Sequence, residues 1–132
     1  SKRKFGGLVI SFLALLGILF NLFVYPGLTK NESPEVVAGK RLSYLVECIE
    51  VHKTNKGSYP ENLKEWLENN NEDVIFIKDP INMKNEFYYE LLQDKESYYL
   101  FSTGIDGKPF TQDDIYPSSL PNIGQIGFRK KN

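Results

Sequence analysis

The sequence predicts an α+β fold in which a membrane-spanning helix precedes a small domain of helix and antiparallel sheet. Three observations predict it. An uncharged apolar run covers residues 5–25, apolar residues recur at helical spacing from Ala38 to Ile49, and two β-rich runs follow at 86–92 and 97–102.

Composition favours one folded domain plus an accessory segment. The 132 residues carry 16 Lys and Arg against 17 Asp and Glu, so no basic field indicates nucleic acid as a partner. Aromatic residues make up 14% of the chain, which supports a packed core. The single cysteine cannot form an intrachain disulfide, and no Cys/His set exists for zinc.

The apolar run at 5–25 is expected to be a retained membrane anchor. As a helix it would be about 31 Å long, which matches the hydrocarbon thickness of a bilayer. The preceding SKRK places the N-terminus in the cytoplasm and the rest of the chain on the other side. A cleaved signal peptide is the alternative, but its apolar stretch is normally shorter and VYPGLTKN offers no small-x-small site.

The anchor sets the predicted division of the chain. Residues 1–27 form a cytoplasmic stub and the transmembrane helix, which Pro26-Gly27 ends, and residues 28–33 form a linker. Residues 34–117 form the domain. The C-terminal tail, residues 118–132, is expected to be irregular chain that a partner orders.

Local signals place the helices of the domain. Ser33 is a predicted N-cap with proline at the first helical position, and Gly57 is the predicted stop. A second helix is expected at 60–70, with Trp66 packed inward. The apolar run 74–77 is interpreted as a strand or an extended approach to the sheet.

The two β-rich runs predict an antiparallel hairpin whose strands are joined by a polar loop. Their tyrosines are expected to pack in the sheet, since the basic residues that single-stranded RNA requires are not interleaved with them. His52 is expected to be a half-buried helix residue, because the chain has no second histidine to share a metal.

The segment FSTGIDGKPFTQDDIYP (101–117) places Asp106, Asp113 and Asp114 in one loop with two glycines. Like charges this close repel unless a cation lies between them. Calcium prefers carboxylate and carbonyl oxygens, and a loop supplies both. The alternative is a solvated acidic turn; the order of residues is not that of an EF-hand. We call residues 103–115 the acidic loop.

The order of these motifs resembles the major pseudopilin of bacterial type II secretion systems, the G subunit. The matching motifs are Tyr59-Pro60, Asp79-Pro80 and the run from Ser102-Thr103-Gly104-Ile105-Asp106-Gly107 to Asp113-Asp114-Ile115. The similarity spans roughly residues 38–116, and the loop is its most specific part.

The resemblance implies a spine helix on a small antiparallel sheet and one calcium ion in the acidic loop. By position, Asp106 and Asp113 would be side-chain ligands and Asp114 a third. Main-chain carbonyls near Thr103, Thr111 and Ile115 would complete the shell.

The function expected from the resemblance is that of a non-catalytic structural subunit. It would sit in the bacterial inner membrane by residues 5–25, with the domain periplasmic or extracellular, and contact other subunits of a type II secretion or pilus-related assembly, including further copies of itself. Unlike typical family members, the apolar run contains no Glu or Asp. This favours the alternative of an anchored accessory subunit outside any filament. An enzyme is the third possibility, but no Ser-His-Asp or Cys-His set is apparent, and neither a nucleic acid nor a small-molecule substrate is expected.

Overall fold

A computed structural model describes residues 32–132, and Ser33–Asn132 form one compact unit. The predicted membrane helix at 5–25, the stub before it and most of the linker lie outside the described residues. Within the described part of the chain, no helix combines the length and apolar character needed to cross a bilayer.

The long helix α2, Pro34–Lys56, begins and ends where the sequence predicts. The Ser33 hydroxyl accepts the N–H of Val36, and Pro34 occupies the first helical position, where no intrahelical N–H is required. Gly57 ends the helix in the left-handed conformation and donates its N–H to the Lys53 carbonyl.

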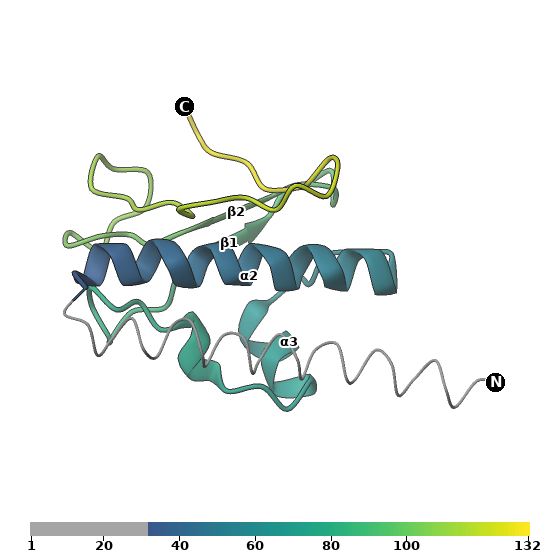
Figure 1. The fold of residues 1–132 in the computed structure, drawn as a ribbon, viewed down its shortest axis with the longest axis horizontal. Helices are drawn as coiled ribbons and strands as arrows, with labels where there is room; N and C mark the ends of the chain where they lie inside the picture. The colour runs from purple at the N-terminus through teal and green to yellow at the C-terminus, as the bar shows by residue number, and fades with distance from the viewer. Residues whose placement is uncertain (1–31) are drawn as a thin grey trace. The chain divides into compact units, whose positions relative to one another are not determined.

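Helix α2 lies between two layers, with the hairpin on one side and α3 on the other (Figure 1). Helix α3, Leu63–Asn69, begins three residues later than expected because the Asn62 side chain, which accepts the N–H of Glu65, provides its cap. Trp66 packs partly buried against the core, as predicted, and its indole N–H donates to Nδ1 of His52 at 3.0 Å. His52 is half-buried, also as predicted.

The apolar run after α3 is the 3₁₀ helix η1, Val74–Ile77, so the prediction of a strand or extended segment there was wrong. The Asp73 carboxylate accepts the N–H of Ile75, and the Asp73 carbonyl accepts the N–H of Phe76. This cap turns the backbone before an extended segment can form.

The predicted hairpin is confirmed as β1, Tyr88–Leu91, paired antiparallel with β2, Tyr98–Phe101. The fold is therefore α+β, with one long helix and a small two-stranded sheet. The core lies where α2 meets the hairpin and the segments beside it, and its fully buried members include Ala38, Leu42, Leu45, Val46, Ile49, Tyr98 and Leu100.

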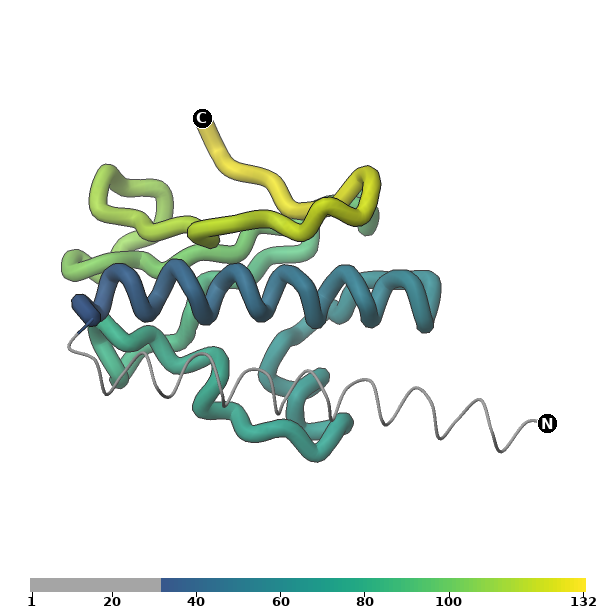
Figure 2. Tube along the Cα trace, in the orientation of Figure 1, coloured from purple at the N-terminus to yellow at the C-terminus, as the bar shows by residue number. Residues whose placement is uncertain are grey.

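The C-terminal tail contacts its own domain, which corrects the expectation that a partner orders it. Tyr98 donates its N–H to the carbonyl of Gly127, and Arg129 donates its N–H to the carbonyl of Tyr98. The tail thus forms a parallel bridge to β2 at Phe128, and Figure 2 shows it running beside the hairpin layer. The free backbone groups of the β2 edge attract it, because an edge strand offers unpaired donors and acceptors.

Candidate functional site

The acidic loop leaves the end of β2 and returns to it. Ser102 and Ile115 form an antiparallel bridge in which each N–H donates to the carbonyl of the other residue, at 2.9 and 3.0 Å. The loop is therefore closed at its neck, and this closure brings Asp106 close to Asp113 and Asp114.

Two buried side chains, Asp79 and Ser102, orient the backbone where the acidic loop begins. Asp79 and Ser102 are both fully buried, and the Ser102 hydroxyl donates to Oδ2 of Asp79. The same hydroxyl oxygen accepts the N–H of Gly104 at 3.1 Å. Asp79-Pro80 is one of the motifs of the resemblance, but no role for the Asp79 side chain was predicted. In the structure, the Asp79 carboxylate orients the first residues of the acidic loop through Ser102.

The three predicted carboxylates meet at the hydroxyl of Thr111. Its Oγ1 lies 2.7 Å from Asp113 Oδ1 and 3.3 Å from one oxygen each of Asp106 and Asp114. A hydroxyl has one hydrogen to donate, so it cannot satisfy three carboxylates at once. Three negative charges are thus concentrated around one neutral group.

Asp113 is the carboxylate most firmly held within the loop. Its Oδ2 accepts the N–H of Asp106 at 2.9 Å. The Thr111 hydroxyl and this N–H lower the pKa of the Asp113 carboxyl below its usual range. Gly104, at φ 66°, packs directly against Asp113, and a Cβ at this position would collide with the Asp113 carbonyl and carboxylate. The glycine is thus required by space as well as by backbone angle.

Two of the three expected carbonyl ligands already accept hydrogen bonds. The Ile115 carbonyl accepts the N–H of Ser102, and the Thr111 carbonyl accepts the N–H of Asp114 at 3.3 Å. Among residues 32–132, no three His, Cys, Asp or Glu side chains stand ready as a ligand set for a metal ion. Binding an ion at the acidic loop therefore requires the carboxylates to turn from the hydroxyl toward it. The oxygen-only donors suit a hard cation such as calcium.

A buried carboxylate that the sequence analysis did not predict, Glu50, lies at the other end of β2. Glu50 is 4% exposed and accepts the hydroxyls of Tyr59 and Tyr98, each at 2.9 Å, and the N–H of Gly127 at 2.9 Å. A Cβ on Gly127 would lie 2.5 Å from the Tyr59 hydroxyl oxygen. Glu50 thus joins α2, β2 and the C-terminal tail.

A cavity of about 460 Å³ adjoins Glu50, and the charged lining of the cavity is committed to the fold. Lys53 pairs with Glu96 at 2.8 Å. The Arg129 guanidinium donates to the carbonyls of Ile126 and Phe128. The ion pair joins α2 to the turn of the hairpin, the Arg129 contacts lie within the tail, and the donors to Glu50 are all neutral.

Comparison of the chain with models of known families, with curated proteins and with solved structures finds no match. The assignment of a function therefore depends on the site and on the motifs of the sequence.

Proposed function

We propose that this chain is a non-catalytic, pseudopilin-like structural subunit that is anchored in the bacterial inner membrane by residues 5–25. Its outward-facing domain is stabilised by calcium in the acidic loop. The subunit acts in a type II secretion or pilus-related envelope assembly. The observation that carries the proposal is the convergence of three carboxylates on the single Thr111 hydroxyl inside a loop closed at its neck.

The arrangement of elements also supports the proposal. A long helix packs on an antiparallel hairpin, and the acidic loop follows the second strand, as the resemblance to the pseudopilin G subunit implies. Asp106, Asp113 and Asp114 would hold the ion, and carbonyls near Thr103, Thr111 and Ile115 would complete its shell. The ion would supply the positive charge that offsets carboxylate repulsion and so stabilise the end of the domain.

The second candidate is an anchored accessory subunit of another membrane complex that does not assemble into a filament. The absence of any Glu or Asp from residues 5–25 favours it. Electron microscopy of detergent-extracted particles separates the two: helical filaments support the first candidate, and discrete complexes support the second.

Thermal unfolding of the full chain in mild detergent tests the calcium assignment. Calcium at 100 times its dissociation constant is expected to stabilise the domain by about 2.7 kcal/mol, and a chelator should remove this gain. Asp113→Asn keeps an acceptor for the Asp106 N–H but removes one charge, so it should abolish the response to calcium, which is measured against the melting temperature of the same variant in chelator.

The matched control is Glu68→Ala, which removes an exposed carboxylate from α3 and should leave the calcium response intact. An identical melting curve for the unsubstituted chain in calcium and in chelator would refute the metal assignment.

A further inference from the structure

The outer face of the hairpin carries an aromatic cluster that includes a residue of the acidic loop. Its members are Tyr88, Tyr99, Phe101, Phe110 and Tyr116. Phe110 is the central member, because its ring contacts Tyr88, Tyr99 and Phe101 at centroid distances of 5.3 to 5.4 Å.

Phe110 is held in an unfavourable backbone conformation. Its φ is 64°, in the left-handed region that residues with a Cβ rarely adopt. The residue lies between Asp106 and Asp113 in the sequence, next to Thr111, on which the carboxylates converge. Its three ring contacts therefore offset the backbone cost and couple the shape of the acidic loop to the hairpin face.

The end of the C-terminal tail contacts the same cluster. Nζ of Lys131 lies 4.3 Å from the centroid of the Phe110 ring, and Nζ of Lys130 lies 4.5 Å from that of Tyr116. Both distances are within the range of a cation–π interaction. The hydrogen bond from the Arg129 N–H to the Tyr98 carbonyl positions the two lysines for these contacts.

We propose that docking of the C-terminal tail and calcium binding by the acidic loop are linked through Phe110, so that each favours the other. This inference rests on the calcium site of the proposed function. An ion that bridges Asp106 and Asp113, which flank Phe110 in the sequence, would restrict the loop and with it the ring that Lys131 contacts. Linkage is reciprocal, so a docked tail must raise calcium affinity by the same factor by which calcium favours docking.

The tail lysines have two opposite effects on calcium affinity, charge repulsion and the cation–π contact, and the experiment below distinguishes them. The positive charges of Lys130 and Lys131 repel calcium and would weaken its binding if the tail acted through charge alone. The cation–π contact on Phe110 instead strengthens binding. An exposed contact of this kind corresponds to a change of about two- to fivefold in an equilibrium constant.

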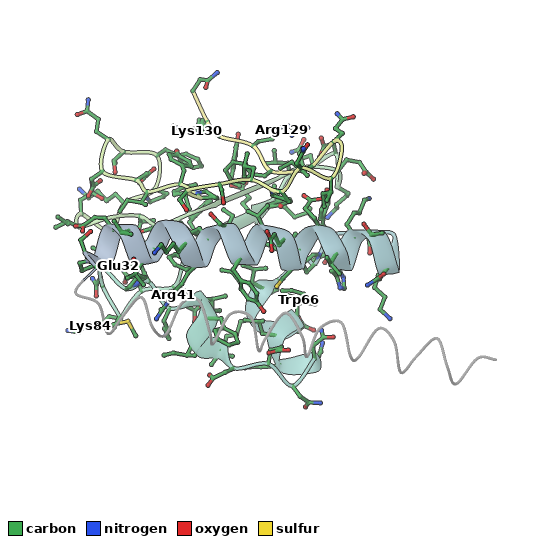
Figure 3. The ribbon with its side chains drawn as sticks, in the orientation of Figure 1. Glu32, Arg41, Trp66, Lys84, Arg129 and Lys130 are labelled. Carbon is green, nitrogen blue, oxygen red and sulfur yellow. The ribbon has the colours of Figure 1, made fainter. Side chains whose placement is uncertain are left out.

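Calcium titration of the full chain in detergent, followed by calorimetry, is the test. Lys131→Met keeps the length of the side chain and removes its charge, and it should weaken calcium binding about two- to fivefold. Lys131→Arg retains the cation–π contact and should bind as the unsubstituted chain does. Lys84→Met is the charge-matched control: this exposed lysine lies on the other side of α2 from Lys130 in Figure 3 and should have no effect.

A double-mutant cycle assigns the effect to the ring. Phe110→Leu keeps a Cβ at this position but removes the aromatic face, so Lys131→Met should have no further effect in that background. Hydrogen exchange of the Arg129 N–H gives the reciprocal readout, because it should slow in calcium by a similar factor.

The outcomes are distinct. Failure of the unsubstituted chain to bind calcium overturns both the proposed function and the linkage. Normal calcium binding with an unchanged or tightened affinity in Lys131→Met overturns the linkage alone.

Discussion

Glu50 and the aspartates of the acidic loop flank β2 at opposite ends, and they are in opposite electrostatic situations. Glu50 is one buried charge that accepts two tyrosine hydroxyls and one backbone N–H. Asp106, Asp113 and Asp114 are three charges in partial contact with solvent that accept one backbone N–H each and share one hydroxyl. The first set is complete within the chain, because each donor is supplied by the fold.

The second set has more negative charge than the chain offsets. A buried carboxylate with all its donors acts as a fixed part of the core, since removing it leaves those donors without partners. Clustered carboxylates near the surface repel one another and can bind an external cation. The number and kind of hydrogen-bond donors thus distinguish the two sites. Glu50 stabilises the fold, and the acidic loop is proposed to bind a cation from solution.

The largest expected effect is at Glu50. Glu50→Ala leaves the hydroxyls of Tyr59 and Tyr98 and the N–H of Gly127 without their acceptor, and it should lower the free energy of unfolding by about 3 kcal/mol. Urea denaturation of the full chain in detergent measures this loss. Glu47→Ala, an exposed change on the same helix, should stay within about 0.5 kcal/mol. Equal effects of the two variants would contradict the special status of Glu50.

A glycine substitution at the neck of the acidic loop should have a smaller effect. Gly104→Ala combines left-handed strain with a collision against Asp113, and we expect a loss of about 2 kcal/mol together with the calcium response. Gly124→Ala at φ 85° has strain without a collision, because no atom beyond its two neighbours in the chain lies within 4 Å of the added Cβ, and should cost about 1 kcal/mol. If the two variants lose the same stability, the contact with Asp113 is unimportant.

The smallest and most diagnostic effect is the dependence of stability on pH. Burial and the hydrogen bond to Glu50 raise the pKa of Tyr59 from 10.0 to about 12, and burial also raises the pKa of Tyr98. A raised pKa means that the stabilisation is complete below pH 10 and is lost as the pH climbs toward 12.

At the acidic loop the sign is reversed. The lowered pKa of Asp113 contributes stability that is present above pH 3.8 and is lost as the pH falls below that value. Denaturation followed across the pH range, with each variant compared with its own stability at pH 7, should therefore show Tyr59→Phe altering the pH dependence only in the alkaline limb and Asp113→Asn only in the acid limb. A change in the opposite limb for either variant would show that the two ends of β2 are not independent.

Much of the fold could be predicted because its signals are local. Ser33 and Gly57 terminate α2 by hydrogen bonds to residues within the adjacent turn, so their identity and spacing are sufficient. The hairpin is similarly local, because its two strands are neighbours in the sequence. The sharing of one loop by Asp106, Asp113 and Asp114 was expected from their spacing, while the Ser102–Ile115 bridge that closes the loop was not, and its capacity to bind calcium stays a prediction.

The features that were missed depend on residues far apart in the sequence. Glu50 comes directly after Ile49, the last apolar residue of the predicted stripe, and nothing near it in the sequence indicates that Tyr98 and Gly127 will donate to it. The tail was misjudged for the same reason, since its partner is the edge of β2. The run 74–77 was misassigned because a four-residue apolar stretch suits several backbones, and the cap at Asp73 decides among them.

Gly127 has no side chain, and this allows the last residues of the chain to pass close to Tyr59. The Tyr59 ring occupies the volume that a Cβ would need, so only a glycine can lie opposite it. A shift of the tail by one position would bring Ile126 or Phe128 against that ring, and both are too large for the gap. Glycine at position 127 therefore fixes the register of the tail against β2. This register determines which surface Lys130 and Lys131 contact.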